Sequence, residues 1–483
     1  MKAENSNKVQ KGVKVFLPFY LFTSLLFFVA VLLFFGLAYP HHLHYQEQYQ
    51  LFLFDSTYVW EIVKHPGGVA DLLGRFCTQF FLFAWVGAAI IALLLSAVQL
   101  LTLRLINSQL STLNSQLFYG LSFVPSFLLW LFLLDENALI SGVWAVLLTL
   151  LVACVIVRLT NGWIRRILLI VAIPVLYVLV GPVCFPIPIE SLWHGVHCYR
   201  YPTVFPWLLW GASLSAFVLW ITGTVLRDTI SKGNWIIRTV PVILVAVVMG
   251  PLVWKNANFK AEKVMQYDFM VCHQQWNRIL ETVYIEKPNN QIGVTVQNLA
   301  MAMHGVLLDR MFDFNQNSIH GLLPDVKEDA TSPLPTAEAF YQLGMINVAQ
   351  RTVFEAQEAI LDFQKSGRCY KRLAQTNLID GQYEVARKYL MALQKTLFYR
   401  DWANETLPLL GNEKAIANHP EYGRLRRFAY NEDFYFSDHV TPEMLESLYY
   451  RNTDNRLAYQ YLLAYCMLTG DQERYNRIIS KKQ

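Results

Sequence analysis

The chain has 483 residues, of which 54% are hydrophobic and only 16% are charged. Ordinary soluble domains carry roughly 25% charged residues, so this composition excludes a wholly water-soluble protein. The charges are also unevenly distributed: residues 1–254 hold 14 basic and 9 acidic side chains, a net charge of +5, whereas residues 255–483 hold 26 and 27, a net charge of −1. We therefore predict a membrane domain over 1–254 and a domain of soluble composition over 255–483.

Seven apolar stretches in the first domain are each long enough to cross a bilayer, which takes about 20 apolar residues in a helix. The third and fourth stretches are separated only by Asp135-Glu136-Asn137, which predicts a tight helical hairpin. If that pair were a single re-entrant element, the count would fall to six or five. A signal peptide is the alternative for the first stretch, but its length and the lack of a small-x-small cleavage site favour a retained span. The stretches are residues 15–39, 79–103, 117–134, 138–157, 167–185, 204–225 and 236–254.

The distribution of basic residues between the loops predicts the orientation of the spans. If the N-terminus is cytoplasmic, the cytoplasmic segments carry eleven Lys or Arg and the outer loops carry three, Lys64, Arg75 and Arg200. Lys and Arg are enriched in cytoplasmic loops. With seven spans, residues 255–483 then lie on the outer face. We predict a protein of the bacterial inner (plasma) membrane with a periplasmic C-terminal domain.

The first outer loop, residues 40–78, mixes aromatic and charged side chains. Aromatic residues such as Phe54 and Trp60 alternate with acids such as Glu47 and Asp55. This mixture is typical of an amphipathic helix lying in the membrane interface. Pro66-Gly67-Gly68 breaks the pattern, and a second short helix is expected to follow. We therefore predict two interfacial helices joined by this turn.

The span interiors contain almost no ionisable side chains, and Gln99 is one of the few strongly polar residues there. Ion-coupled carriers usually need carboxylates or histidines within the membrane, so this pattern argues against a proton-driven transporter. The polar groups gather in the outer loops instead. They are Asp135 and Glu136 in the second outer loop, and His194, His197 and Arg200 in the third.

Each of these groups also has a plainer interpretation. Asp135-Glu136 is equally typical of a solvated hairpin turn. His194 and His197 would place two imidazoles on one helical face, but the sequence offers no third ligand, so we predict no metal site. Cys184 and Cys198 flank the third outer loop, where an oxidising compartment would allow a disulfide.

Residues from 261 onward have the pattern of short amphipathic helices, apart from one β-rich run at 291–296. Three helix pairs follow the spacing of tetratricopeptide (TPR) repeats, in which small residues allow paired helices to pack closely. Gly344, Gly381 and Gly470 stand at the turns of these pairs. Stacked repeats form a solenoid whose concave surface usually binds a partner or peptide. A helical lid without a binding role is the alternative.

The predicted fold is therefore all-α, with a polytopic bundle of about seven spans and an extracytoplasmic TPR-like domain. The first loop reads EQYQLFLFDSTYVWEIVKHPGG, with FCTQFF after it. These segments resemble the opening of an uncharacterised family of bacterial multi-spanning inner-membrane proteins that also carry a helical-repeat tail. The resemblance covers most of the chain and implies the same architecture, but it implies no activity.

The layout also resembles the GT-C class of membrane glycosyltransferases, which combine a seven-span module, a long first outer loop with two interfacial helices, and a soluble outer domain. This resemblance implies a transferase that uses a polyprenyl-phosphate-linked sugar. The implied catalytic residues are the carboxylates of both loops, and a basic group would hold the lipid-linked phosphate. The carboxylates are Glu47, Asp55, Asp135 and Glu136, and the phosphate-binding group is Arg200 with His194 and His197.

Such a transfer needs a base or a metal-holding carboxylate for the acceptor, and a cation for the departing phosphate. A divalent metal is therefore compatible with this assignment, although the sequence names no cofactor. Loop one lacks the paired acids that are common near the first span in the GT-C class. No sequence motif of a known GT-C family is present, so the resemblance is one of layout.

Three functions are compatible with the sequence. The first is a lipid-linked sugar transferase acting on the outer face, which requires at least one essential loop acid. The second is a non-catalytic membrane-anchored scaffold, whose repeat domain binds envelope proteins or peptides. The third is a lipid or solute transporter, which needs a polar cavity between the spans. No glycine-rich nucleotide-binding motif follows a predicted strand, and the near-neutral second domain disfavours nucleic-acid binding.

Overall fold

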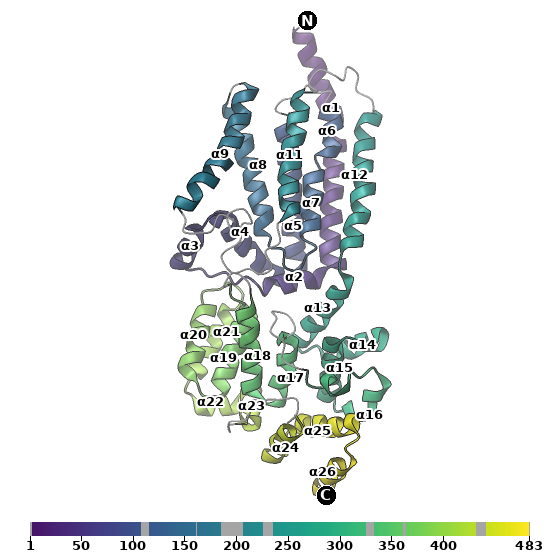
Figure 1. Cartoon of the computed structure of the whole chain (residues 1–483), viewed down its shortest axis with the longest axis vertical. Coiled ribbons are helices and arrows are strands. Elements are labelled where there is room, and N and C mark those ends of the chain that lie inside the picture. Colours follow the sequence, from purple (N-terminus) through teal and green to yellow (C-terminus); the bar gives the residue numbers. More distant parts are fainter. Residues whose placement is uncertain are drawn as a thin grey trace. The chain divides into compact units, whose positions relative to one another are not determined.

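The computed structural model describes residues 2–107, 115–160, 162–184, 206–225, 235–324, 333–360, 364–430 and 441–482. These residues form helices and turns, and none of them forms a strand, which confirms the all-α fold class (Figure 1). The β-rich run 291–296 was the exception in the sequence, and it is helical, as part of α15 (Gln291–Met303). The side chain of Asn290 caps this helix by accepting from the N–H of Gly293, and tertiary burial overrides the β propensity of the run.

The chain divides into two compact units, each with its own core. The first unit comprises Met1–Glu47 and Asp55–Phe259, and the second comprises Gln48–Phe54 and Lys260–Gln483. A short piece of the first predicted outer loop therefore belongs to the second unit. As a result, the chain passes between the units three times.

The first unit is a bundle of long apolar helices with short helices beside them. In sequence its helices are α1 (Lys2–Leu33), η1 (Phe34–Ala38), α2 (Pro40–Glu47), α3 (Ser56–Val63), α4 (Gly68–Thr78), η2 (Gln79–Leu82), α5 (Ala84–Asn107), α6 (Ser115–Leu121), α7 (Val124–Phe132), α8 (Ser141–Leu159), α9 (Trp163–Cys184), α11 (Trp207–Val225) and α12 (Trp235–Asn256). Helix α5 packs against α1, α7 and α8, and α12 packs against α6 and α7 (Figure 1). Many large apolar side chains remain exposed on these helices, such as Leu21, Leu93 and Val247, as a lipid-facing surface requires.

Four helices among the described residues are long and apolar enough to cross a membrane: Pro18–Ala38, Ala84–Asn107, Ser141–Leu159 and Thr239–Asn256. Two further apolar helices, Phe118–Phe132 and Trp207–Gly223, are shorter. These helices fit a membrane protein. The predicted third span is bent at Ser122-Phe123, where α6 ends and α7 begins.

Gln99, the polar residue within the second predicted span, lies fully buried in a hydrogen-bonded cluster. Its Nε2 donates to Oγ of Ser122 (3.0 Å), and its Oε1 accepts from Oγ of Ser24 (3.3 Å). Tyr119 donates from its hydroxyl to the carbonyl of Tyr20 (2.8 Å). Hydrogen bonds between helices stabilise apolar bundles, so this cluster joins α1, α5 and α6.

The first predicted outer loop contains the two expected short helices, α3 and α4, joined by a turn that contains Pro66 and Gly67. The expected amphipathic pattern, however, does not continue as helix before Ser56. The carboxylate of Asp55 accepts from the N–H groups of Thr57 (2.9 Å) and Tyr58 (3.4 Å), so Asp55 is the N-cap of α3. Helix α2, which precedes this point, was not predicted.

The segment Gln48–Phe54 begins with a turn at residues 48–49, forms no helix or strand over the rest of its length, and packs in the second unit. The N–H of Leu51 donates to the carbonyl of Lys365 (2.7 Å), and the N–H of Phe54 donates to that of Lys395 (2.7 Å). The side chain of Leu51 is 7% exposed. It packs in an apolar cluster with Ala374, Leu390, Leu393 and Ala403.

The second unit is built from short helices. They are α13 (Phe259–Cys272), α14 (Trp276–Glu286), α15, α16 (Leu307–Arg310), η3 (Met311–Asp313), η4 (Ser318–Gly321), α17 (Pro333–Leu343), α18 (Ile346–Ala359), α19 (Gly367–Ile379), α20 (Tyr383–Leu393), α21 (Arg400–Thr406), η6 (Leu407–Leu409), α22 (Glu413–Asn418), α23 (Tyr422–Phe428), α24 (Thr441–Arg451), α25 (Arg456–Thr469) and α26 (Gln472–Lys482). The three predicted helix pairs are α17/α18, α19/α20 and α25/α26. Gly344, Gly381 and Gly470 stand at their turns, each with a φ between 74° and 91°, a region that favours glycine. Helices α17 to α20 pack in sequence, each against the next (Figure 1).

We expect the substitution Leu51→Ala to destabilise the second unit by about 2 to 5 kcal/mol, because it leaves a cavity in a buried apolar cluster. The midpoint of urea unfolding measures this effect. Unfolding is monitored by the maleimide labelling of the thiols of Cys369 and Cys466, which are buried in the folded protein. Met391→Ala on α20 is the control, since that side chain is 54% exposed. An equal midpoint for Leu51→Ala and wild type would show that the segment does not belong to this core.

Candidate functional site

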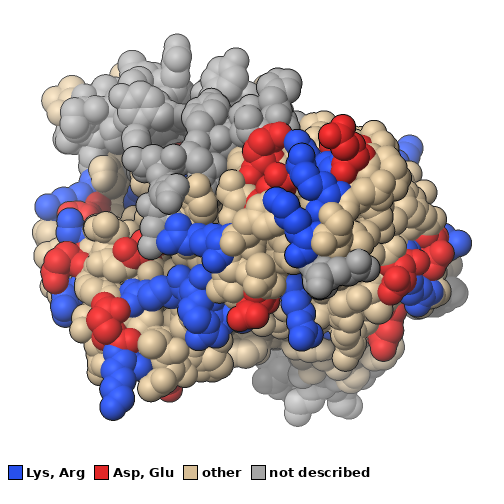
Figure 2. All heavy atoms as spheres, turned by 90° about the horizontal axis from the view of Figure 1, so that it is seen from below, with Lys and Arg blue, Asp and Glu red and all other residues tan. Residues whose placement is uncertain are grey.

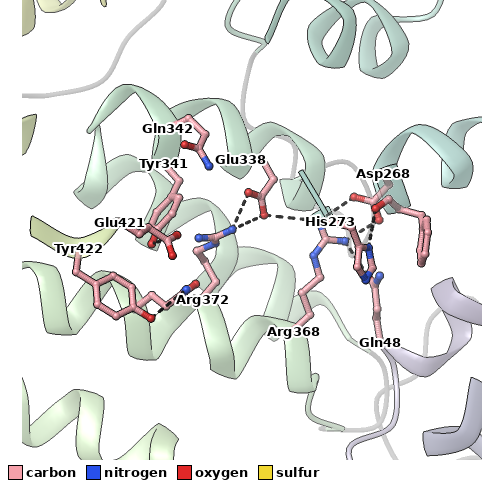
Figure 3. A network of polar contacts seen from close by, with 12 residues as sticks. Gln48, Asp268, His273, Glu338, Tyr341, Gln342, Arg368, Arg372, Glu421 and Tyr422 are labelled. Atoms are coloured by element: carbon pink, nitrogen blue, oxygen red, sulfur yellow. Dashed lines mark hydrogen bonds and ion pairs between the residues drawn. The ribbon is translucent and has the colours of Figure 1, made fainter. Parts of the chain in front are cut away.

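Four charged side chains are buried together in the second unit (Figure 3). Arg368 and Arg372 lie four residues apart on α19, a spacing that places both on one face of a helix. Asp268 comes from α13 and Glu338 from α17. The residue exposures of Arg368, Asp268 and Glu338 are 8% or less, and the side chain of Arg372 is 12% exposed. A buried charge is tolerated only when it is paired and hydrogen-bonded, so the geometry of the pairs matters.

Arg368 forms a two-pronged ion pair with Asp268. Its Nη1 donates to Oδ2 (2.6 Å) and its Nη2 donates to Oδ1 (2.9 Å). Burial opposes the charge of Arg368, but the carboxylate of Asp268 more than offsets it, so the pKa of Arg368 lies well above its ordinary value. Nη1 also donates to Oε1 of Gln48 (3.4 Å), which brings the segment Gln48–Phe54 into the network.

Arg372 pairs with Glu338 and stacks on an aromatic ring. Its Nη2 lies 2.6 Å from each carboxylate oxygen of Glu338. Its guanidinium carbon lies 3.7 Å from the ring centroid of Tyr341, close enough for a cation–π interaction. The hydroxyl of Tyr341 donates to Oε1 of Glu421 (2.9 Å). Nη2 of Arg368 also lies 3.9 Å from Oε1 of Glu338, which joins the two pairs. The polar chain therefore runs from Gln48 to Glu421 (Figure 3).

Glu421 also lines a pocket of about 650 Å³ in the second unit. Protein pockets that take small molecules commonly measure roughly 300 to 1,000 Å³. The wall comes from the end of α15, from α17, α23 and α25, and from the turns before α14 and α23. Its principal polar side chains are His304, Gln342, His419, Arg424, Arg456 and Gln460.

The hydrogen bonds of His419 fix which of its ring nitrogens carries the proton. Its Nδ1 accepts from the backbone N–H groups of Glu421 (3.3 Å) and Tyr422 (3.2 Å). A neutral imidazole has one donor and one acceptor nitrogen, so Nε2 carries the proton and is a donor. The ring stacks on Tyr422, with centroids 4.0 Å apart. This arrangement gives the pocket a fixed N–H group.

The backbone of Gln274, which also lines the pocket, has a φ of 52°. Residues other than glycine rarely adopt a positive φ. Backbone strain of this kind is common at ligand sites. It is therefore consistent with a functional role for this pocket.

The four carboxylates proposed for catalysis occupy three different environments in the first unit. Glu47, the last residue of α2, is 7% exposed. Asp55 is the N-cap of α3, so its carboxylate already has a structural role. Asp135 is exposed and accepts from the N–H of Asn137 (2.8 Å), which closes the hairpin turn. Glu136 follows it and is half-buried.

Helix α2 and the turn that carries Asp135-Glu136 are joined by hydrogen bonds. Nε2 of Gln46 donates to the carbonyl of Ala138 (2.7 Å). The hydroxyl of Tyr39 donates to the carbonyl of Leu134 (3.4 Å). The structure therefore brings the first and second predicted outer loops together at this point.

The third predicted outer loop lies outside the described residues, and with it His194, His197, Arg200 and Cys198. Their proposed roles, and the disulfide between Cys184 and Cys198, stay predictions. Among the residues that the structure does describe, no three His, Cys, Asp or Glu side chains come together as metal ligands would.

The sequence analysis missed the buried network and the pocket. One signal was available: two arginines four residues apart on a predicted helix, together with lone acids in the apolar runs YDFMVC and AEAF. The sequence does not show which arginine pairs with which acid, because Arg368 and Asp268 are 100 residues apart. On the face drawn in Figure 2, Lys and Arg lie among Asp and Glu without a continuous basic field, which does not favour nucleic-acid binding.

We expect Asp268→Asn to destabilise the second unit by about 3 to 5 kcal/mol, because it leaves Arg368 buried without its counter-ion. The same urea titration with maleimide labelling measures the loss. Asp313→Asn is the matched control, since Asp313 pairs with Arg310 at an exposed site and exposed pairs contribute roughly 0 to 1 kcal/mol. Similar losses for the two variants would contradict a structural role for the buried network.

Comparison with other proteins places this architecture in a family. Neither a curated protein nor a solved structure matches the chain. A family model does match it over residues 16–482, which takes in nearly the whole chain and both units. This agrees with the resemblance of the first loop to an uncharacterised family. The chain belongs to the family of unknown function DUF6057.

Proposed function

We propose that this protein is a membrane-anchored scaffold, whose second unit binds an envelope protein or peptide outside the cytoplasm. The observation that carries the proposal is the location of the polar chemistry. The second unit holds a pocket of about 650 Å³ with charged walls, backed by a buried ion network. In the first unit, Asp55 and Asp135 are engaged in local capping and turn bonds. Binding by the second unit is therefore better supported than catalysis by the loops.

The anchor in this proposal has seven spans and lies in the bacterial inner membrane. The four helices that are long and apolar enough to cross a membrane, the two shorter ones and α9 (Trp163–Cys184) together supply seven. The excess of basic residues in alternate loops supports a cytoplasmic N-terminus. The second unit is then periplasmic, and α3 and α4 lie in the outer interface of the bilayer.

The second unit is TPR-like in this proposal. Its support is the sequential packing of α17 to α20 as antiparallel neighbours turned at glycines. The unit also already holds a non-helical segment of chain, Gln48–Phe54, by main-chain hydrogen bonds and one buried leucine. Helical repeats bind extended peptides in a similar way.

We expect alkaline phosphatase fused to the C-terminus to be active and green fluorescent protein at the same place to be dark, because the second unit follows an odd number of spans. Fusions after Leu159, in a predicted cytoplasmic loop, should give the reverse. Enzyme activity and fluorescence in whole cells measure both. A fluorescent C-terminal fusion would overturn the periplasmic assignment, and with it the proposed class of partner.

We expect a photocrosslinking amino acid at Gln274 or His304, both on the pocket wall, to form a discrete adduct with an extracytoplasmic protein or peptide in living cells. Glu384 on α20 is the control position, since its side chain is 84% exposed and does not line the pocket. The adduct is identified by mass spectrometry. The scaffold proposal fails if the two pocket positions give no adduct, or only those that position 384 also gives.

A second candidate function is the GT-C-like transferase, and one observation favours it. Glu47 is a buried carboxylate at the end of α2, and its neighbour Gln46 bonds to the turn that follows Asp135-Glu136. Burial in a low-dielectric site is how enzymes prepare a carboxyl group for acid–base work. In this alternative Glu47, Asp55, Asp135 and Glu136 act on the acceptor or hold a divalent metal. Arg200, with His194 and His197, would bind the phosphate of a polyprenyl-linked sugar.

If the protein is a transferase, Glu47→Gln should abolish its product, because the amide cannot act as a base. Mass spectrometry of envelope glycans from a deletion strain complemented with each variant measures this. Glu61→Gln on α3 is the matched control, since Glu61 is exposed. If the Glu47→Gln variant fully restores the glycan product, the buried carboxylate of Glu47 is not needed for the reaction, and it no longer favours a transferase.

A lipid or solute transporter is the third candidate, and it has the least support. Such a protein needs a polar path between its spans. Gln99, the strongly polar side chain buried there, bonds to Ser24 and Ser122. Both ends of its amide are therefore used within the bundle.

A further inference from the structure

Two arginines of the pocket are not paired with a carboxylate. Arg424 donates from Nη2 to Oε1 of Gln342 (2.9 Å). Among the residues that the structure describes, no ion pair joins Arg424 or Arg456 to an acid. Burial lowers the pKa of Arg424, which reflects the partial loss of water around its guanidinium. An anion in the pocket would supply the missing partner.

The same pocket also offers an acceptor for N–H groups. Glu421 is half-buried on its wall and uses Oε1 for Tyr341, which leaves Oε2 as an acceptor. Gln460 lines the pocket too, but its Oε1 is enclosed by the protein, and its Nε2 donates to the carbonyl of Ala302 (3.0 Å).

We propose that this pocket binds a ligand that carries a carboxylate and, a few bonds away, an N–H donor, as a free amino acid or the C-terminal end of a peptide does. The carboxylate pairs with Arg424 and Arg456. The N–H group donates to Oε2 of Glu421. The inference rests on the proposed scaffold function, for which it names the chemical group that is recognised.

A simple inorganic anion fits this wall less well. Phosphate or sulfate would satisfy the arginines, but it would face the carboxylate of Glu421 without an intervening N–H group, which is repulsive. An anion of that size would fill only a small part of about 650 Å³. The pairing of cations with acceptors on one wall favours a ligand with both kinds of group.

The donor on Nε2 of His419 adds specificity for the anionic part of the ligand. Because Nδ1 is held by two backbone N–H groups, the neutral ring donates from Nε2. A carboxylate has two oxygens and can accept several such bonds. An uncharged C-terminal amide would lose the charge-assisted bonds to the arginines, each of which contributes roughly 1.5 to 3 kcal/mol in proteins, or tenfold or more in affinity.

The test uses the full chain in lipid nanodiscs and three probes: a library of tripeptides with free carboxyl termini, the same library as C-terminal amides, and a mixture of free amino acids. Retained molecules are measured by mass spectrometry after rapid gel filtration. We expect the free-acid tripeptides or the amino acids to be retained about tenfold or more above the amides. Which of the two is enriched identifies the source of the carboxylate.

Three variants make the result specific. Arg456→Gln, at an exposed position, should lower retention of the acids about tenfold, and Arg424→Gln should do the same. Arg427→Gln is the matched control, because Arg427 is exposed and lies on the same helix as Arg424. Equal retention of acids and amides, no retention of any probe, or full retention by both pocket variants would each overturn the proposal.

The photocrosslinking experiment separates this inference from the proposed function. If position 274 or 304 still gives a specific adduct while no carboxylate probe is retained, the scaffold stands and the ligand assignment fails. If acids are retained but no extracytoplasmic adduct forms, the pocket binds a small molecule and the scaffold fails. The two proposals can therefore be rejected independently.

Discussion

The rest of the second unit depends on two buried ion pairs, which join Arg368 to Asp268 and Arg372 to Glu338. Two guanidinium groups on one face of α19 cannot be buried without counter-ions, because the desolvation of a charge costs several kcal/mol. Asp268 on α13 and Glu338 on α17 supply them. Three helices from distant parts of the sequence are thereby held in one arrangement. The same bonds position Tyr341 and, through its hydroxyl, Glu421 on the pocket wall.

The same network reaches a segment that begins next to the membrane bundle. Gln48 accepts from Arg368, and Leu51 three residues later is buried among helices α19 to α21. Glu47, just before Gln48, ends α2 in the first unit. Asp55, just after Phe54, caps α3. One short stretch therefore has three structural tasks, and each involves a different kind of interaction. Its sequence is constrained by the second unit as much as by the first.

Much of the fold could be predicted from the sequence, because the relevant forces are local. Runs of apolar residues predicted the long helices, and glycines between amphipathic repeats predicted the pairs turned at Gly344, Gly381 and Gly470. Asp55 before Ser-Thr is itself a typical N-cap signal, but the aromatic alternation around it was interpreted as one continuous helix. The packing of Gln48–Phe54 in the second unit could not be predicted from the sequence, because its hydrogen bonds go to Lys365 and Lys395, more than 300 residues away.

The candidate site was predictable only in part, for the same reason. The sequence directed attention to acids in the loops, and the resemblance of the layout to the GT-C class implied a transferase. The positions of Arg200, His194 and His197 lie outside the described residues. The pocket forms where α15, α17, α23 and α25 meet. Its arginines, Arg424 and Arg456, resemble ordinary surface residues in sequence, since nothing local shows that they share one wall. Only the tertiary arrangement gives them a common ligand.

The central claim is that the pocket of the second unit is a ligand site with two cations awaiting an anion. A cryo-electron microscopy map of the full chain, purified in lipid with its native ligands retained, tests this most directly. The account predicts non-protein density in contact with the guanidinium groups of Arg424 and Arg456 and with the carboxylate of Glu421. An empty pocket in which an acid of this chain, such as Glu421, pairs with both arginines would contradict it.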